Sequence, residues 1–438
     1  MRSLSHFEGD MSTRSHHDRL REIGQEQVLR FWDELDEAGR ERLTRQLEAL
    51  DLEAIDELAD TYVRNKVPFD LPATIEPVEA LPREPRDGAE RERYDEAERR
   101  GRELLAGGRV AAFLVAGGQG TRLGYDGPKG EFPVTPIARK PLFQVFAEQL
   151  MAHSREAGRS IPWYVMTSAA NDADTRAFFQ SRNFFGYPAE DVLFFEQGMM
   201  PAFDFDGRML LAERDSLALS PDGHGGSLRA LGRSGARADM RRRGVEHLSY
   251  FQVDNPLTHV VDARFLGLHD LTGSEMSSKT IPKAHALEKV GNFVVGDGQL
   301  QVIEYSDLPE ELARQSDDAG RLRFNAGSIA IHALRVSFVE RLNAGGRLQL
   351  PWHRAEKKVP HVDDPAPAAP NAVKLEQFVF AAIPLAESPM VYETDRAEEF
   401  SPVKNAEGAD SPETCRRDQS RRAARWLAAA GVEVPTTD

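Results

Sequence analysis

Between residues 110 and 253, short apolar runs alternate with helical segments, and this alternation restricts the fold more than any other feature of the sequence. Residues 110–116 (VAAFLVA) form an apolar run bounded by glycines, which is typical of a buried strand. The pattern predicts further strands at 161–167, 191–195 and 247–253, separated by helices at 141–155 and 172–183. It therefore predicts an α/β fold with a mostly parallel sheet covered on both faces.

Ligands of such sheets bind beyond the carboxyl ends of the strands, so the loops that follow strands are the first places to look for function. We expect a hairpin at 292–305, a strand at 328–332 and a closing helix at 411–430. The sequence thus divides into a helical N-terminal region (1–105), an α/β core (106–350) and a C-terminal region (351–438). Prolines between residues 68 and 85 mark an irregular connection into the core.

Composition limits the classes of function. The chain has 55 basic and 71 acidic residues, and its net charge of −16 argues against a general nucleic-acid binder. There is no apolar run long enough to span a membrane, and residues 1–21 lack the apolar core of a signal peptide. The single cysteine, Cys415, fits a reducing compartment. We therefore expect a cytoplasmic protein that binds neither nucleic acid nor membrane.

A glycine-rich loop, AGGQGTRLG, follows the first predicted strand at residues 116–124. It lacks the lysine of a Walker A motif, and the third glycine of a dinucleotide fingerprint is replaced by Leu123. Glycines let backbone N–H groups approach phosphate oxygens closely. Arg122 and, in the following GPKG, Lys129 add two cations, so the loop suits a triphosphate from which pyrophosphate departs.

Several further segments resemble the eukaryotic-type UDP-N-acetylhexosamine pyrophosphorylases, which belong to the wider UDP-glucose pyrophosphorylase family. The glycine loop is similar to that of the N-acetylhexosamine branch, since the glucose branch has a pattern closer to NGGLG. The other similar segments, in the family's order, are FWDEL (31–35), FEQG (195–198), SPDGHGG (220–226), QVDNP (252–256), VIEYS (302–306), FNAG (324–327), KLEQFVF (374–380) and EFSPVKN (399–405). The resemblance covers residues 25 to 420.

The resemblance implies a Rossmann-like nucleotidyltransferase core, GT-A-like, that joins UTP to a sugar 1-phosphate, here N-acetylglucosamine 1-phosphate. It implies that Asp254, at a strand end, binds Mg²⁺ or Mn²⁺, which prefer oxygen ligands. Arg122, Lys129 and Lys404 would be the catalytic cations. Transfer then needs positioning and charge neutralisation, with no covalent enzyme intermediate and no general base. We expect a monomer or weak homo-oligomer.

The resemblance also implies contacts to the uracil and to the sugar. An amide such as that of Gln197 can both donate to and accept from the edge of a pyrimidine. The nucleotide would contact Ala116, Gly117, Gly118, Gln197, Gly223 and His224. The sugar would contact Asn255, Gly291, Glu304, Asn325, Phe378 and Phe380. The two phenylalanines alternate along a predicted strand, so both could face an N-acetyl pocket.

Two positions depart from the N-acetylhexosamine branch. His224 stands where that branch has asparagine, whereas glucose-type and broad-specificity enzymes have G-H-G there, and Ala381 stands where an aspartate is usual. A UDP-glucose or broad-specificity pyrophosphorylase is therefore an alternative. A second is a glycosyltransferase with a D-x-D metal motif, which occurs at 172–174 and 204–206. A third is a non-catalytic nucleotide-sugar sensor, which would lack the three cations.

Overall fold

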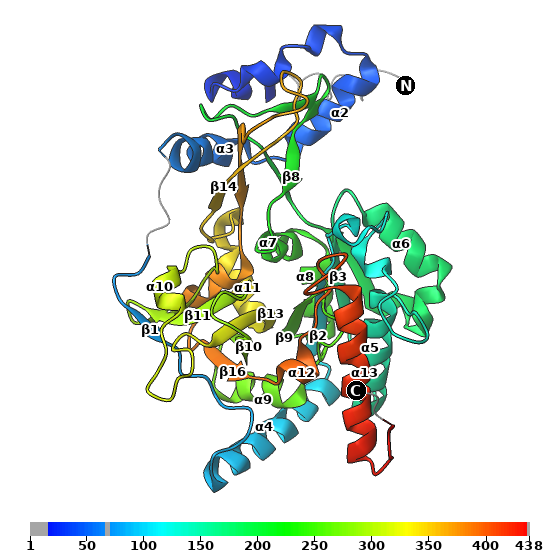
Figure 1. The fold of residues 1–438 in the computed structure, drawn as a ribbon. Helices are drawn as coiled ribbons and strands as arrows, with labels where there is room; N and C mark the ends of the chain where they lie inside the picture. The colour runs from blue at the N-terminus through cyan, green and yellow to red at the C-terminus, as the bar shows by residue number, and fades with distance from the viewer. Residues whose placement is uncertain (1–15, 66–70, 436–438) are drawn as a thin grey trace. The chain divides into compact units, whose positions relative to one another are not determined.

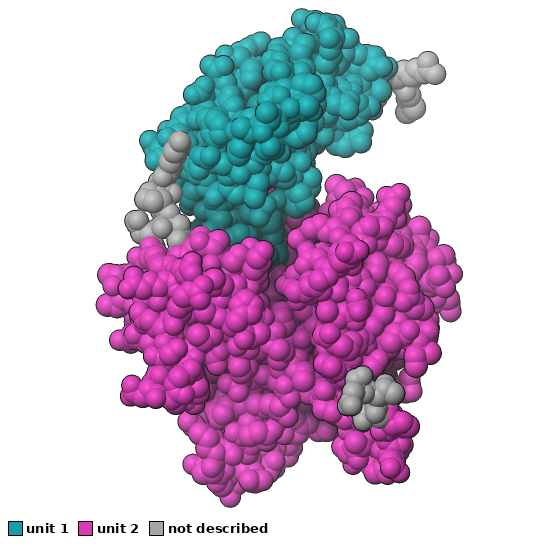
Figure 2. Space-filling model, viewed as in Figure 1, with its two compact units in different colours: residues 1–70, 198–226, 350–378 teal, residues 71–197, 227–349, 379–438 magenta. Residues whose placement is uncertain are grey.

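The computed structural model describes residues 16–65 and 71–435 of the chain (Figure 1). The predictions for residues 1–15 and for Pro68 lie outside these ranges. Two compact units are distinguished by colour in Figure 2. One contains residues 1–70, 198–226 and 350–378, and the other contains residues 71–197, 227–349 and 379–438. These boundaries differ from the three consecutive regions expected from the sequence, because segments distant in the chain belong to the same unit.

The larger unit comprises residues 71–197, 227–349 and 379–438. It is built on a ten-stranded sheet with the main strand order β1-β11-β13-β9-β2-β3-β4. Three further strands lie outside this order: β10 pairs with β13 and with β16, and β12 pairs with β11. The strands are β1 (Ile75–Pro77), β2 (Val110–Val115), β3 (Trp163–Thr167), β4 (Val192–Glu196), β9 (His247–Gln252), β10 (Met276–Pro282), β11 (Gly291–Gly296), β12 (Gln299–Ile303), β13 (Ala326–Arg335) and β16 (Met390–Glu393).

Four neighbouring strands, β4, β3, β2 and β9, are parallel. Helices α5 (Leu142–Ala157) and α6 (Asp172–Ser181) connect the first three of these in the chain. Residues of β2 are almost entirely buried because this strand lies inside the sheet with both faces covered. The strands and helices predicted between residues 110 and 253 are thus confirmed, and so is the α/β class.

The other half of the sheet is antiparallel in most of its pairings, so the sheet is mixed rather than mostly parallel. Strand β13 runs antiparallel to β9, β10 and β11. The predicted hairpin is confirmed as β11 and β12, with Gly296 opposite Gln299. Its two-residue turn, Asp297-Gly298, has positive φ angles of 49° and 79°, as a type I′ turn requires.

Further helices of this unit pack closely on one another. Helix α4 (Gly88–Ala106) packs on α9 (Ala263–Leu271). A Cβ on Gly101 would lie 1.7 Å from the Ala263 carbonyl oxygen, so glycine permits this close crossing. The remaining helices are α7 (Gly226–Arg233), α8 (Ala236–Arg243), α10 (Glu310–Ala313), α11 (Val336–Leu342), α12 (Arg396–Glu399) and α13 (Pro412–Ala429).

The smaller unit combines the N-terminal helices with short strand pairs. It contains the helices α2 (Glu37–Glu48) and α3 (Leu52–Leu58), each capped by an aspartate side chain at its amino end. The antiparallel pairs are β5 (Met199–Pro201) with β8 (Leu219–Pro221), β6 (Leu211–Glu213) with β7 (Ser216–Leu217), and β14 (His353–Lys357) with β15 (Ala372–Glu376). Leu43, Leu47, Phe203 and Leu375 belong to its apolar core.

Two local predictions are wrong. The N-terminal region is not α-helical at every expected place, because residues 26–29 and 32–34 form separate 3₁₀ turns. Phe378 and Phe380 do not alternate along a strand, since β15 ends at Glu376 and residues 379–385 form a 3₁₀ helix that contains Pro384. Within residues 16–65 and 71–435, no helix is long and apolar enough to cross a lipid bilayer.

Candidate active site

The loops expected to carry function follow four adjacent parallel strands. The glycine loop follows β2, Ser168 to Asn171 follow β3, Gln197 follows β4, and Asp254 follows β9. Because these strands are parallel neighbours, their carboxyl ends meet at one edge of the sheet. The predicted nucleotide and metal residues of the larger unit therefore converge on a single region.

The glycine loop is closed by hydrogen bonds of its own backbone. The Lys129 N–H donates to the Gly118 carbonyl at 3.0 Å, and the Gly120 N–H donates to the Gly127 carbonyl at 2.9 Å. Gly127 has a φ of 141°, which a residue with a side chain rarely adopts. The fold of the loop thus brings Lys129 back to the start of the glycine run.

Two polar residues of the β3 loop support the glycine run and were missed from the sequence. Asn171 donates its side-chain amide to the Ala116 carbonyl at 3.0 Å and to the Gly118 carbonyl at 3.4 Å. Ser168 donates its hydroxyl to the Gly117 carbonyl at 2.9 Å. Both side chains are buried. A Ser-x-x-Asn pattern directly after a predicted strand is the signal that could have identified them.

Lys129 lies at the centre of the predicted cation group. Its side chain is 8% exposed, and burial lowers the pKa of its ammonium. The Asp254 carboxylate opposes this pKa shift, whereas the neighbouring charges of Arg122 and Lys404 add to it. The structure therefore brings all three predicted cations and the predicted metal ligand within electrostatic range of one another.

Asp254 is anchored through its backbone. Its carbonyl oxygen accepts a hydrogen bond from the Val403 N–H at 2.8 Å, which places the residue preceding Lys404 beside it. Among the described residues, none donates a hydrogen bond to the Asp254 carboxylate. The carboxylate oxygens therefore remain available, and such oxygens are the donors that a hard divalent cation takes.

Gln197 lies against the glycine run. Its Oε1 is 2.1 Å from the position that a Cβ on Gly117 would occupy, so these two residues are in direct contact. The Gln197 N–H donates to the Thr167 carbonyl at 2.9 Å, and its side chain is 9% exposed. Gln197 thus joins Ala116, Gly117 and Gly118 in the predicted nucleotide site.

Gly291 and Glu304 face one another across the β11–β12 hairpin. A Cβ on Gly291 would lie 2.6 Å from Val302 Cγ1 and 3.7 Å from Glu304 Oε1, so only glycine leaves room here. Burial raises the pKa of the Glu304 carboxyl, and the positive charge of Lys404 opposes that shift. Two of the predicted sugar residues therefore lie together and within electrostatic range of a predicted catalytic cation.

Asn255 and Asn325 use their amides within the protein. Asn255 is buried; its Nδ2 donates to the Glu399 carbonyl at 2.6 Å, and its Oδ1 accepts from the Ser401 N–H at 3.1 Å. Asn325 Oδ1 accepts from the Lys283 N–H at 2.9 Å. Both side chains have a structural role here, and their contacts with a sugar stay predictions.

Three predicted residues belong to the smaller unit. Gly223 has a φ of 87°, and a Cβ there would lie 2.3 Å from the Gln377 carbonyl oxygen. The His224 ring stacks on Phe378 at a centroid distance of 5.2 Å. His353, which belongs to none of the sequence motifs, lies against the same phenylalanine at a centroid distance of 4.4 Å. Phe380 is buried in the larger unit.

Both D-x-D motifs have structural roles. Asp172, at the start of α6, accepts from the Thr167 hydroxyl and pairs with Arg176, each at 2.6 Å. Asp204 Oδ1 accepts from the backbone N–H groups of Asp206 and Arg208 at 2.9 and 2.8 Å, which closes a turn. These contacts agree with the interpretation that neither motif is a metal site.

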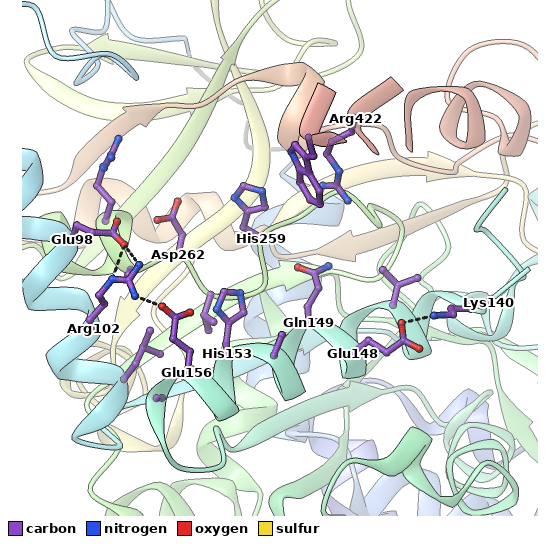
Figure 3. A pocket seen from close by; sticks show the side chains of 18 of the residues that line it. Glu98, Arg102, Lys140, Glu148, Gln149, His153, Glu156, His259, Asp262 and Arg422 are labelled. Carbon is purple, nitrogen blue, oxygen red and sulfur yellow. Dashed lines mark hydrogen bonds and ion pairs between the residues drawn. The ribbon is translucent and has the colours of Figure 1, made fainter. Parts of the chain in front are cut away.

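A large cavity of about 1050 Å³ lies elsewhere in the larger unit, lined by residues of α4, α5 and α13 (Figure 3). Gln149 and His153 project from α5 toward His259, which lies near Asp262. With Glu399, His259 and Asp262 form a cluster of metal-ligand type. However, Lys279 Nζ lies 2.6 Å from an oxygen of each carboxylate, so a cation already occupies the place between them.

The model of the UTP–glucose-1-phosphate uridylyltransferase family matches residues 72–409. The chain belongs to this family. It is 39% identical to the human UDP-N-acetylhexosamine pyrophosphorylase-like protein 1 over 94% of its own length and 85% of that protein. It is 36% identical to the UDP-N-acetylglucosamine pyrophosphorylase of Saccharomyces cerevisiae over 94% of its length and 91% of the relative. The family predicted from the motifs is therefore confirmed.

A solved structure agrees with this family assignment. The uridine diphosphate N-acetylglucosamine pyrophosphorylase of Trypanosoma brucei, in complex with an inhibitor, superposes with a TM-score of 0.84 at 28% identity. The match covers 96% of this chain and 88% of that chain. The similarity of this family member to a pyrophosphorylase thus extends over both compact units.

Proposed function

We propose that this uridylyltransferase-family member converts UTP and N-acetylglucosamine 1-phosphate into UDP-N-acetylglucosamine and pyrophosphate. The observation that carries the proposal is the convergence of Arg122, Lys129 and Lys404 on Asp254 at the carboxyl edge of the parallel strands. The glycine loop of the N-acetylhexosamine type and the names of the relatives support the choice of sugar. The core would be Rossmann-like, of the GT-A-like nucleotidyltransferase type.

In the proposed reaction, an oxygen of the sugar 1-phosphate forms a bond to the α-phosphorus of UTP. The bond from that phosphorus to the α,β-bridging oxygen breaks, and pyrophosphate leaves with the electron pair. Arg122 and Lys129, on the glycine loop, would hold the triphosphate while Lys404 approaches from the C-terminal segment. These cations stabilise the charge that develops on the phosphate oxygens, which is the main requirement of such a transfer.

The donor chemistry at Asp254 fits a divalent cation, because its carboxylate accepts no hydrogen bond from the described residues and lies near the phosphate-binding cations. Asp254 would hold Mg²⁺ or Mn²⁺. When bound, the metal neutralises charge on phosphate oxygens. The protein's own contribution is to keep the Asp254 carboxylate and the Lys129 ammonium in a fixed relation, through the Val403 contact and the closure of the glycine loop.

Recognition of the two organic groups would be divided among the remaining predicted residues. Gln197, braced on Gly117, would pair with the uracil edge, and the uracil contact of the Gly223–His224 backbone in the smaller unit stays a prediction. Gly291 and Glu304 would bind the sugar ring and its hydroxyls. Asn325 and Phe380 of the larger unit would contact the acetamido group, and the same contact for Phe378 of the smaller unit stays a prediction. The expectation of a cytoplasmic monomer or weak homo-oligomer stays a prediction.

A second candidate activity uses glucose 1-phosphate or several sugars. The observation that favours it is His224, whose ring stacks on Phe378, one of the residues assigned to the acetamido pocket. A histidine at this place could fill space that an N-acetyl group would need. This candidate preserves the reaction and changes only the sugar.

The test is pyrophosphate release from UTP with Mg²⁺ and a panel of sugar 1-phosphates. The panel contains the N-acetylglucosamine, N-acetylgalactosamine, glucose and galactose forms. We expect release with N-acetylglucosamine 1-phosphate at a kcat/KM at least about tenfold above that of glucose 1-phosphate, since one well-placed polar contact supplies about 1.4 kcal/mol or more. The reverse order would establish the second candidate, and UTP binding with no release from any sugar would favour the sensor.

A further inference from the structure

Lys279 is a fully buried lysine in the middle of β10. Its Nζ donates to Asp262 Oδ2 at 2.6 Å and to the two carboxylate oxygens of Glu399 at 2.7 and 2.6 Å. Moving a lysine and two carboxylates out of water costs desolvation free energy. The attraction between their charges offsets this cost only when the geometry is well fixed. Stability alone is therefore a weak reason for a network of this kind.

Glu399 is the hub of this network, and several segments of the larger unit meet on its side chain. The Thr394 hydroxyl donates to Glu399 Oε2, and the His259 N–H donates to Oε1 at 3.2 Å. Glu399 is 1% exposed. Its carboxylate thus joins β10, the loop before α9 and the segment after β16.

The backbone of the same residue is joined to the loop that carries Asp254. The Glu399 carbonyl accepts from Asn255 Nδ2 at 2.6 Å, and the Ser401 N–H donates to Asn255 Oδ1 at 3.1 Å. Two residues further, the Val403 N–H donates to the Asp254 carbonyl at 2.8 Å. The segment 399–403 is therefore held along the Asp254–Asn255 loop, and Lys404 is the next residue.

We propose that Lys279 and Glu399 are positioning residues for uridylyl transfer, because they hold the 399–404 segment so that Lys404 keeps its place relative to Asp254. The inference rests on the proposed roles of Asp254 and Lys404 in the reaction. Neither Lys279 nor Glu399 touches the substrates in this arrangement. They act on the reaction only through the segment that they fix.

The physical reason is the precision that phosphoryl transfer requires. Its catalysis depends on the placement of charges around the reacting phosphorus, and a displacement of about 1 Å can cost about 10²-fold in rate. Lys404 itself is only moderately restrained: its ammonium lies 3.5 Å from Asp410 and 5.6 Å from the centre of the Phe400 ring. Its backbone N–H donates to the Asp410 carbonyl at 2.7 Å, and on the other side its place is set by the residues that precede it, in the segment 399–403.

The variant Glu399→Gln tests the proposal, since it preserves the shape of the hub and removes its charge. We expect kcat to fall by about 10- to 100-fold. We expect the KM for UTP to change by less than about twofold, because the glycine loop and Gln197 have no contact with the network. A milder variant, Thr394→Val, removes one hydrogen bond to the hub and should show the same kcat-specific loss at a smaller size.

The matched control is Asp270→Asn. Asp270 accepts from Arg100 Nε at 2.8 Å in another partly buried ion pair, and it lies beside His247 at the start of β9, the opposite end of that strand from Asp254. This variant should lower the melting temperature and leave kcat unchanged. A loss of kcat confined to the Glu399 and Thr394 variants then distinguishes positioning from general stability.

A double-mutant cycle with Lys404→Met completes the test. If the network acts through Lys404, Glu399→Gln should cost less than about threefold in kcat once Lys404→Met is present. If the two losses multiply, or if folded Glu399→Gln and Thr394→Val proteins have wild-type kcat, the positioning role is refuted while Lys404 retains its proposed role. If Lys404→Met alone has full activity, the proposed role of Lys404 fails first, and the positioning inference falls with it.

Discussion

The side chain of Gln197 occupies the space beside Gly117 that any other residue would need for its Cβ. Gln197 Oε1 lies 2.1 Å from that position, well inside the contact distance of two atoms. The turn after β4 is therefore fitted to the turn after β2, two strands away in the sheet. Glycine is required at residue 117 for as long as Gln197 keeps this place.

Gly117→Ala should displace Gln197 and weaken UTP binding without unfolding the protein. We expect the KM for UTP to rise by about tenfold or more, because the loss of one buried amide contact costs roughly 1–3 kcal/mol. Steady-state kinetics at saturating sugar 1-phosphate measure this change. Gly88→Ala is the control, since a Cβ there meets nothing within 4 Å. An unchanged KM in Gly117→Ala would remove Gln197 from uracil recognition.

Asp254→Asn should abolish most of the metal-dependent activity of a folded protein. The fold depends on the Asp254 carbonyl, which accepts from Val403, and asparagine retains that carbonyl. We expect kcat to fall by about 10²- to 10³-fold, as for the loss of one electrostatic contact to the transition state. Activity measured over a Mg²⁺ titration gives the result.

The control for this variant is Asp204→Asn, which alters an aspartate that closes a turn of the smaller unit. It should leave the Mg²⁺ dependence unchanged. Wild-type activity of Asp254→Asn at low Mg²⁺ would show that another group holds the metal.

Much of the fold could be predicted because local pattern and tertiary environment agree. Residues 110–115 are apolar throughout, and the strand is buried on both faces. Asp297-Gly298 has the residues that a two-residue hairpin turn needs, and both adopt positive φ. At these places the chain has few alternatives, so sequence alone was sufficient.

Prediction failed where distant segments decide the local structure. Phe378 and Phe380 alternate as strand residues do, yet Pro384 and the contacts of residues 379–385 with β12 favour a 3₁₀ helix. Lys279 resembles an exposed lysine in a strand, because its partners Asp262 and Glu399 are 17 and 120 residues away. Of the candidate site, motifs could identify the residues predicted to contact the ligands, but not those that support them, such as Asn171 and Glu399.

The lowered pKa of Lys129 predicts a loss of activity at alkaline pH. Burial lowers the pKa of its ammonium, so the charge disappears at a lower pH than in an exposed lysine. The rate should therefore fall as pH rises through this lowered pKa. Over the same range, the unfolded chain binds more protons than the folded protein, so this group makes stability rise with pH. The opposite trends of kcat/KM and melting temperature distinguish loss of charge from unfolding.

Lys129→Arg provides the comparison, because a guanidinium remains charged throughout this range. The variant should be less active at neutral pH, and its rate should not fall as pH rises over the range in which the wild-type rate falls. If the rate of both proteins falls over the same pH range, the group that loses its proton is not Lys129.

The lowered pKa of His247 predicts that the folded protein loses stability at acidic pH. It is fully buried, and burial lowers its pKa from 6.5 to about 4 despite the Asp270 carboxylate nearby. His269, whose ring lies 5.3 Å away, has a pKa lowered in the same direction, chiefly by burial. Since the unfolded chain gains protons at these sites first, the stability is complete above pH 6.5 and is lost as pH falls toward 4. At pH 5 the contribution lost by His247 is about 2 kcal/mol.

Urea unfolding at pH 7 and pH 5 measures this loss, with His247→Gln as the variant. The variant should be less stable at pH 7, since glutamine fits the site less well, but its stability should fall less between the two pH values, by about 2 kcal/mol. His285→Gln, which alters an exposed histidine, should show the wild-type dependence on pH. If His247→Gln also retains the full acid loss, the protons are taken up elsewhere and His247 does not set the acid limit of the fold.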